Sequence, residues 1–210
     1  VDILNKEAWE QKAFIRAGKL SVSELMQETF TRIETANPHE NALVNLHSKE
    51  DCYKLAAENT SLGGDLGGMP MAIKDLANVK GFKTTEGSPL YAERVAQKDD
   101  QMVARLRAAG ALFIGKTNTP EFGLGSNTFN PVYGKTKNPY DLSKTCGGSS
   151  GGAAVALATR MLSISDGSDM MGSLRNPAAW NNVYGLRPTW GLIPPEPSGE
   201  IFLSQLSTLG

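Results

Sequence analysis

Two serines in glycine-rich turns and one lysine are the residues of this sequence whose types and spacing favour nucleophilic chemistry. Ser149 lies in Gly147-Gly-Ser-Ser-Gly-Gly152, Ser173 follows it by 24 residues, and Lys74 lies upstream after a short apolar stretch. A serine must lose its proton to attack a carbonyl, and a lysine accepts that proton only when burial or nearby positive charge keeps it neutral. A second hydroxyl can relay the proton, because it both donates and accepts. The set therefore suggests acyl transfer without histidine.

The segment between the two serines must bring them together, because they are far apart in the sequence. The alanine-rich stretch from Ser150 to Arg160 predicts a helix that leads about 16 Å away from Ser149. The extended segment that follows, of about six residues, returns about 20 Å. We therefore expect the Ser173 turn beside the Ser149 turn. Ser149 would also lie at a helix N-terminus, where free N–H groups and the helix dipole favour developing negative charge.

The rest of the chain alternates predicted helices and strands, which is typical of an α/β architecture. Ser21 and Glu24 form a capping-box pattern, and apolar residues recur at helical spacing from there to Asn37. Further expected helices cover Glu50–Glu58, Gln101–Ala109 and Gly152–Met161, and expected strands cover Met71–Ile73, Ala111–Ile114 and Leu162–Ser165. The first of these strands places Lys74 in apolar surroundings, the condition that lowers the pKa of a lysine.

Composition and charge limit the classes of function. A chain of 210 residues with 40% hydrophobic and 20% charged residues fits one soluble domain. A net charge of −1 gives no basic surface for nucleic acid or an anionic membrane, and no apolar run approaches the roughly 20 residues that span a bilayer. Cys52 and Cys146 make no disulfide framework and fit the reducing cytoplasm, although the start at Val1 leaves a removed leader open. No residue cluster has metal-ligand spacing, so we expect no metal and no cofactor.

One stretch imitates a phosphate-binding loop. The residues from Gly110 to Thr117 match G-x-x-x-x-G-K-T letter for letter. The four intervening residues are apolar, however, and predict a core strand rather than an exposed loop. A helix should begin after Lys116, but Asn118-Thr-Pro120 follows instead. We therefore expect a strand that ends in a polar turn, with nucleotide binding as a remote alternative.

Other nucleophile patterns fail on their context. Gly147-Gly-Ser-Ser-Gly151 satisfies G-x-S-x-G, the nucleophile elbow of α/β-hydrolases, in which the catalytic histidine follows the serine. His39 and His47 both precede it, so that interpretation requires a histidine beyond Gly210. Cys146 has no neighbouring charge that would lower its pKa. We expect a solvated turn at His39, a structural role for His47 and an unreactive Cys146.

Several motifs together carry a resemblance to a known family. They are Gly68-Met-Pro-Met-Ala-Ile-Lys-Asp75, Thr84-Thr-Glu-Gly-Ser88, Gly110-Ala111 through Gly115-Lys-Thr-Asn118, Asn138-Pro139, Gly147-Gly-Ser-Ser-Gly-Gly152, Ser168-Asp169 with Gly172-Ser-Leu-Arg175, and Gly185-Leu-Arg-Pro-Thr189. In this order and approximate spacing, residues 63–210 resemble the amidase signature family of serine hydrolases. Residues 1–62 resemble the less distinctive N-terminal helices of that family.

The resemblance implies a Ser–Ser–Lys triad. Ser173 would be the nucleophile, Ser149 the bridging serine, which carries a cis peptide bond in the family, and Lys74 the terminal base. Backbone N–H groups of the oxyanion turn would stabilise the developing charge, with further residues in support. The implied oxyanion residues are Met170, Met171 and Gly172, and the supporting residues are Ser150, Asp169 and Arg175.

The implied fold is α/β, with a mixed, mostly parallel central sheet flanked by helices. It would form one amidase-type domain over residues 1–210, with N-terminal helices in 1–62 and the catalytic core in 63–210. Members of the family are much longer than this chain. We therefore expect the chain to hold the N-terminal half of the fold, with the other half absent or supplied by a further fragment or chain.

The implied activity is hydrolysis of a linear carboxylic amide to an acid and an amine or ammonia, through an acyl-Ser173 intermediate. Two alternatives stay open: an amidotransferase A subunit that releases ammonia for a partner, and an inactive amidase-like binding module. The second rests on Met170 and Met171, where the family usually has Thr-Gly, and on the short length of the chain; we expect altered substrate preference rather than lost activity. The expected partner is a small-molecule amide, with neither nucleic acid nor membrane, and a homodimer stays open.

Overall fold

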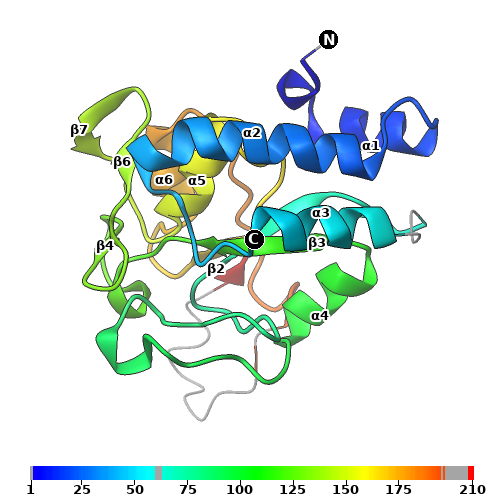
Figure 1. Cartoon of the computed structure of the whole chain (residues 1–210). Coiled ribbons are helices and arrows are strands. Elements are labelled where there is room, and N and C mark those ends of the chain that lie inside the picture. Colours follow the sequence, from blue (N-terminus) through cyan, green and yellow to red (C-terminus); the bar gives the residue numbers. More distant parts are fainter. Residues whose placement is uncertain (1, 60–62, 195, 197–207) are drawn as a thin grey trace.

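The computed structural model describes residues 2–59, 63–194, 196 and 208–210, in which helices and strands alternate (Figure 1). The α-helices are α1 (Ala8–Arg16), α2 (Val22–Glu40), α3 (Lys49–Glu58), α4 (Gln101–Ala108), α5 (Gly151–Ala158) and α6 (Arg175–Trp180). The strands are β1 (Leu43–Val44), β2 (Pro70–Lys74), β3 (Leu112–Thr117), β4 (Phe129–Asn130), β5 (Gly134–Lys135), β6 (Lys137–Asn138), β7 (Asp141–Thr145), β8 (Ser168–Asp169) and β9 (Thr208–Leu209). Short 3-10 helices are η1 (Ile3–Asn5), η2 (Pro89–Tyr91) and η3 (Glu121–Gly123).

The central sheet has the strand order β1-β3-β2. Strands β2 and β3 are parallel, with Pro70 opposite Leu112 and Lys74 opposite Thr117, whereas β1 pairs antiparallel with the end of β3. Figure 1 shows α2 and α3 on one side of this sheet and α4 on the other. The expected mixed sheet flanked by helices is therefore confirmed, and its longer pairing is the parallel one.

The alternation of side chains along the sheet separates two hydrophobic cores. Ala72 faces the core that contains α2 and α5, whereas Met71 and Phe113 face the core that contains Val103 of α4. Successive residues of a strand point to opposite faces, so a strand covered on both faces is apolar along its whole length. Lys74 is the last residue of such a strand. Because both faces of the strand are covered, the Lys74 side chain lies in the interior of the protein.

Helix α2 begins as its sequence predicts and ends later. Ser21 Oγ accepts the N–H of Glu24 at 3.1 Å, and Glu24 Oε2 accepts the N–H of Ser21 at 2.8 Å, which confirms the capping box. The helix continues beyond Asn37 through Pro38 and stops at Asn41, whose φ of 56° is left-handed. A proline lacks one N–H donor, and in the last turn the loss is small enough for the helix to continue.

Two predictions around α5 are wrong. The helix ends at Ala158, three residues earlier than expected, and the chain turns at Arg160, whose φ of 59° is left-handed. The expected strand over Leu162–Ser165 is not formed; instead Ser165 Oγ donates to Ala72 O of β2 at 3.3 Å. A short apolar run predicts burial but does not distinguish a strand from an irregular buried segment, and here side chains replace the backbone ladder.

The imitation of a phosphate-binding loop is a core strand, as the sequence context indicates. Strand β3 extends three residues beyond Ile114 and includes Lys116, which is fully buried. Lys116 Nζ donates to Ala77 O and lies 3.7 Å from Asp75 Oδ1. A buried ammonium group is tolerated when a carboxylate and a carbonyl compensate it. The lysine therefore braces the turn that follows β2 and is not free to bind a phosphate.

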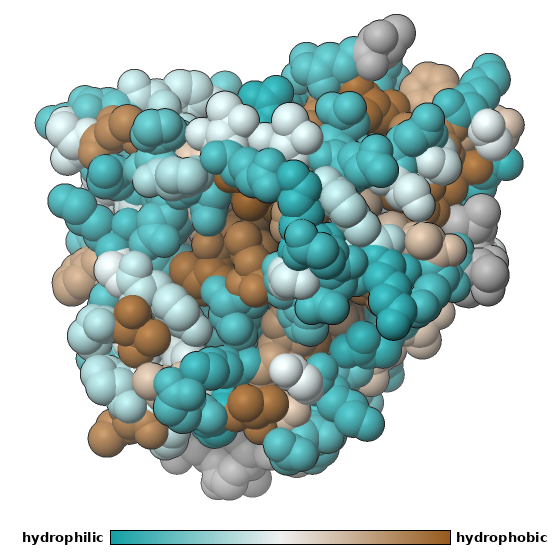
Figure 2. Space-filling model, in the orientation of Figure 1, coloured by the Kyte–Doolittle hydropathy of each residue, from teal (hydrophilic) through white to brown (hydrophobic). Residues whose placement is uncertain are grey.

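The surface shown in Figure 2 is mainly hydrophilic, with apolar residues in separate patches. Isolated apolar side chains on a surface are ordinary in folded proteins. Within the described ranges, no helix combines the length and the apolar character needed to cross a membrane.

Candidate active site

Lys74 lies at the carboxyl end of β2 and contacts three serine hydroxyls. Its side chain is almost fully buried, with 2% of the residue exposed. Lys74 Nζ donates to Ser149 Oγ at 2.6 Å, to Ser150 Oγ at 2.8 Å and to Ser168 Oγ at 3.0 Å. The structure therefore brings together the lysine and the first serine that the sequence analysis selected, across 75 residues of chain.

Burial lowers the pKa of Lys74 to about 7, although the charges of Asp166 and Asp169 oppose this shift. A lysine with this pKa is neutral in a large fraction of molecules at physiological pH. A neutral amine has a lone pair that can accept a proton from a hydroxyl at hydrogen-bond distance. The environment of Lys74 is thus suited to a general base.

The turn that carries Ser149 is held by close packing around its glycines. The peptide bond between Gly148 and Ser149 is cis, as the resemblance implies, and α5 begins two residues later. A side chain at Gly152 would collide with the backbone of Asn118 and Ala42. Glycine at this position lets α5 pack directly against the end of β3, which fixes the direction of the turn.

The turn that carries Ser173 is organised by the buried carboxylate of Asp169. Its oxygens accept the N–H of Gly172 at 2.8 Å and of Leu174 at 3.1 Å, and they pair with Arg175 through Nε at 2.9 Å and Nη2 at 3.0 Å. Burial would raise the pKa of Asp169, but the Arg175 pair and these N–H groups outweigh it and hold the pKa far below its ordinary value. The carboxylate is therefore ionised and closes the turn from both ends.

The two serine turns meet through the backbone. Ser150 N donates to Ser173 O at 3.1 Å, which confirms the expectation that the turns lie side by side. Ser173 is half-buried, whereas Ser149 is buried. Among the described residues, however, no hydrogen bond joins the hydroxyls of Ser149 and Ser173. The first link of the expected relay is present and the second is not made in this structure.

The predicted oxyanion residues differ in what their N–H groups do. The N–H of Gly172 is bound by Asp169, and its φ of 112° is a conformation that a side chain rarely adopts, which explains the glycine. Met171 is not in the left-handed region, so the backbone accepts its side chain, and 85% of this residue is exposed. Met170 is 42% exposed. Neither methionine is packed into the interior.

Sequence reasoning missed two polar contacts of Lys74. Ser168 Oγ accepts from Lys74 Nζ, and the carboxylate of Asp166 accepts the backbone N–H of Lys74 at 2.9 Å. Ser168 belongs to a recognised motif, and this could have suggested a role. Asp166 follows a stretch that was expected to be a strand, and an acidic residue in an apolar segment was the available signal.

The residues that the sequence analysis rejected as nucleophile or base form no described hydrogen bond with Lys74, Ser149 or Ser173. Burial raises the pKa of Cys146 to about 12, which leaves an unreactive thiol. His47 packs against Phe82 with ring centroids 3.9 Å apart, and partial burial lowers its pKa from the ordinary value. Within the described parts of the chain, no group of three or more His, Cys, Asp or Glu residues is arranged to hold a metal ion.

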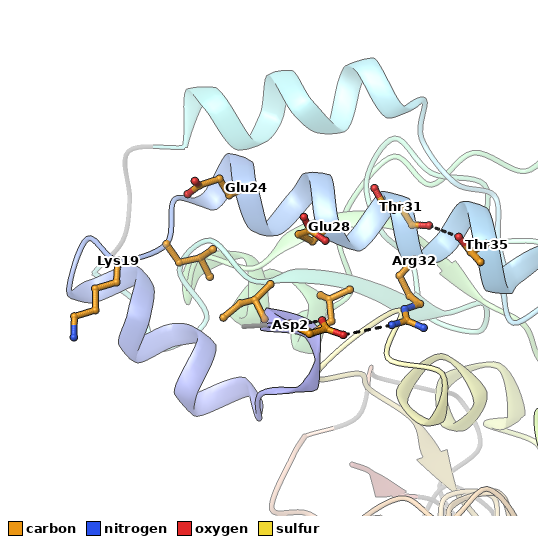
Figure 3. Close-up of a pocket in the computed structure, with 10 residues that line it drawn as sticks. Asp2, Lys19, Glu24, Glu28, Thr31, Arg32 and Thr35 are labelled. Carbon is orange, nitrogen blue, oxygen red and sulfur yellow. Dashed lines mark hydrogen bonds and ion pairs between the residues drawn. The ribbon is translucent and has the colours of Figure 1, made fainter.

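Two hollows differ in their relation to the site. A cavity of about 220 Å³ lies beside Lys74, and its polar lining includes Asp100, Asp166 and Glu196. A larger pocket of about 590 Å³ lies between η1 and α2, where Asp2 pairs with Arg32 (Figure 3). Residues of this larger pocket contact none of the candidate catalytic groups, so we assign it no role in the chemistry.

The Amidase family profile matches residues 24–208, which includes the whole of the site. The chain belongs to the amidase signature family. It is 38% identical over 179 residues to the A subunit of the glutamyl-tRNA(Gln) amidotransferase of Saccharolobus solfataricus, and 42% identical over 193 residues to an acylamidase of Rhodococcus erythropolis. A solved structure of a bacterial aryl acylamidase of the amidase signature family superposes with a TM-score of 0.85 at 31% identity.

These matches cover most of this amidase signature chain but less than half of each relative. They include 85% of the chain for the amidotransferase relative, 89% for the acylamidase and 94% for the solved structure. The corresponding shares of the relatives are 37%, 40% and 42%. A partial family fold therefore accounts for the mixed sheet and helices described above.

Proposed function

We propose that this chain carries the catalytic groups of an amidase, which hydrolyses a carboxylic amide to an acid and an amine or ammonia. Ser173 is the nucleophile, Ser149 the relay and Lys74 the base. The observation that carries this proposal is the 2.6 Å contact between Lys74 Nζ and Ser149 Oγ, in a buried environment that lowers the pKa of Lys74 to about 7.

In the proposed first step, Ser173 Oγ bonds to the amide carbon and the carbonyl electrons move to the oxygen. The Ser173 proton passes to Ser149, whose own proton passes to the neutral Lys74 amine. The resulting ammonium then returns a proton through the relay to the leaving nitrogen, and the C–N bond breaks. Water hydrolyses the acyl-Ser173 ester by the same proton path in reverse.

This path requires the Ser149 and Ser173 hydroxyls to approach one another. Catalytic hydrogen bonds are often long without substrate and tighten when it binds. The backbone contact from Ser150 N to Ser173 O keeps the two turns adjacent, and we propose that a change of the Ser173 side-chain rotamer brings the two hydroxyls together. We expect the hydroxyls to be within hydrogen-bond distance in an acyl-enzyme or inhibitor complex.

For the oxyanion hole, we propose the N–H groups of Met170, Met171 and Ser173 rather than that of Gly172. The Gly172 donor is engaged by Asp169, whereas among the described residues no acceptor binds the other three N–H groups. Any residue type supplies a backbone donor, so the methionines are compatible with the function. Their side chains are exposed, and we propose that they contact the acyl part of a substrate.

A fluorophosphonate probe tests the proposal directly, because it bonds covalently to an activated serine. We expect one adduct per chain, located on Ser173 by peptide mass spectrometry and lost in Ser173→Ala. The reaction should be measured on the 210-residue chain and on any longer protein that contains it. Labelling of another serine, or none in either protein, would contradict the assignment and favour the inactive binding module.

A second candidate is the A subunit of an amidotransferase, and the relative from Saccharolobus solfataricus supports it. That relative is named as the A subunit of an amidotransferase. In this alternative, the present chain would catalyse the same amide hydrolysis and release ammonia for a partner. Free ammonia from glutamine without any partner favours the amidase. Hydrolysis of glutamine that increases severalfold when a partner is added favours the amidotransferase.

A further inference from the structure

The buried charges around Lys74 come in matched pairs, with one exception. Asp75 pairs with Lys116 of β3, and Asp169 pairs with Arg175 and Arg187. Asp166, on the segment that follows α5, forms no ion pair among the described residues, although the charges of Lys116 and Lys74 act on it. It is nevertheless buried, with 8% of the residue exposed. A buried carboxylate without an ion pair is costly unless another group compensates it.

The geometry places this carboxylate against Lys74. Asp166 Oδ1 accepts the backbone N–H of Lys74 at 2.9 Å, and both residues line the cavity beside β2. The groups that face the Lys74 amine itself are three uncharged serine hydroxyls. The charges of Asp166 and Asp169 raise the pKa of Lys74 against the effect of burial, and Asp169 is already compensated by its two arginines.

We propose that Asp166 is the counter-ion of Lys74: its carboxylate provides the negative charge against which Lys74 takes up and returns the proton during the reaction. Asp166 is a positioning residue that touches no reacting atom. Its hydrogen bond fixes the end of β2, and its charge stabilises the ammonium that forms when Ser149 gives up its proton. The proton itself stays on Lys74 Nζ and never passes to Asp166.

The inference rests on the proposed role of Lys74 as base, and its sign follows from electrostatics. A nearby opposite charge favours the ionised form, typically by about one to three pKa units at close range. Burial raises the pKa of Asp166, while the Lys74 N–H and the Lys116 and Lys74 charges oppose that shift. Removing the Asp166 charge should therefore lower the pKa of Lys74 and extend the active form to lower pH.

Two substitutions separate charge from hydrogen bonding. Asp166→Asn keeps an oxygen that can accept the Lys74 N–H but removes the charge, and Asp166→Glu keeps the charge. The matched control is Asp100→Asn, which removes a carboxylate from the same cavity and retains an acceptor for Asn78. The Lys74 signal is followed by NMR of chains labelled with ¹³C at lysine Cε, and Lys74→Arg identifies it.

We expect the titration midpoint of Lys74 to fall in Asp166→Asn and to stay near the wild-type value in Asp166→Glu and Asp100→Asn. An unchanged midpoint in a folded Asp166→Asn chain overturns the proposal. If that variant does not fold, the ¹³Cγ chemical shift of Asp166 in the wild type reports whether its carboxyl group is ionised. The proposal requires an ionised carboxylate at the pH where Lys74 binds its proton. A carboxyl group that stays protonated at that pH overturns the proposal. The titration requires no enzymatic activity. If the wild-type chain is inert but the Lys74 midpoint falls in Asp166→Asn, the result contradicts the proposed function and leaves the electrostatic link between Asp166 and Lys74 in place.

Discussion

The two halves of the candidate site are built differently. On the side of the proposed base, Lys74 and Ser149 are buried, and the lysine amine donates to the hydroxyls of Ser149, Ser150 and Ser168. On the side of the proposed nucleophile, Ser173 is half-buried, and Met171, two residues before it, is mostly exposed. The comparison indicates that burial within this chain already lowers the pKa of Lys74 to about 7, whereas Ser173 and Met171 keep part of their surface exposed.

The largest effect is expected from replacing Ser173, the proposed nucleophile. Ser173→Ala should abolish probe labelling and amide hydrolysis, because it removes the hydroxyl that is proposed to form the acyl-enzyme. Ser143→Ala, which removes an exposed hydroxyl in β7, is the matched control and should retain both activities. Turnover close to wild type in Ser173→Ala would show that Ser173 is not the nucleophile and would point to one of the buried serines instead.

The next largest effect is expected on the buried half. Lys74→Ala should lower kcat by roughly 10²–10⁴-fold, the usual contribution of a general base. Lys74→Arg should be similarly slow, because a guanidinium keeps its proton and cannot accept another. A single-turnover assay of both variants separates the chemical step from binding. Activity in Lys74→Arg that exceeds that of Lys74→Ala by orders of magnitude would show that charge alone matters and that Lys74 is not the base.

The comparison also shows how far the sequence could predict this molecule. Spacing along the chain was sufficient to place the Ser149 and Ser173 turns side by side and Lys74 at the end of a buried strand. The burial of Asp166 was not predicted, because an acidic residue within an apolar segment is only a weak local signal; its burial depends on how the segment after α5 packs against β2. The occupied N–H of Gly172 depends on the orientation of Asp169, which the sequence does not encode locally.

The sheet illustrates the same limit. The parallel pair of β2 and β3 could be predicted from two apolar runs separated by a helix, since that order is typical of α/β folds. The apolar run Leu162–Ser165 has a similar pattern and is not a strand. The difference arises because Ser165 and Asp166 bind the backbone of β2 through their side chains, an arrangement that hydrophobic pattern does not reveal.

Asp169→Asn should loosen the Ser173 turn while leaving the Lys74 contacts in place. The amide cannot compensate Arg175, so we expect the free energy of unfolding at pH 7 to fall by about 1–3 kcal/mol. Because the folded pKa of Asp169 is held below its ordinary value, its stabilisation is present above about pH 4 and is lost as the pH falls. Chemical denaturation at pH 7 and at pH 3 should therefore show a smaller difference between variant and wild type at pH 3.

Asp141→Asn is the matched control for this prediction. Asp141 also accepts an N–H in a turn, from Ser143 at 2.9 Å, but it is exposed and forms no ion pair in the described structure. We expect little change in its free energy of unfolding. Equal destabilisation by the two substitutions would mean that burial and the arginine pair add nothing to the Ser173 turn.

A smaller effect is expected from Met171→Gly, which changes the half that contains the proposed nucleophile without touching its hydrogen bonds. The side chain is exposed and the backbone angle is ordinary, so the substitution should change the relative kcat/KM among amides of different acyl size and retain the chemistry. A panel of acetyl, benzoyl and longer acyl anilides measures this. An inert wild type that gains activity in Met171→Gly would show instead that the methionine closes the oxyanion hole.

The smallest effect is expected from replacing both histidines. This double substitution tests whether the pH dependence of kcat/KM reflects the ionisation of Lys74 or of a histidine. With a Lys74 pKa of about 7, kcat/KM should rise through neutral pH as the amine loses its proton and then level off. An unperturbed histidine titrates near 6.5, so the position of this limb alone does not separate the two groups. Partial burial lowers the pKa of His47 further, and both histidines lie far from Ser149 in the sequence. A His39→Asn, His47→Asn double variant should keep the wild-type profile; a limb that disappears in it would assign the base to histidine and leave the buried lysine a structural residue.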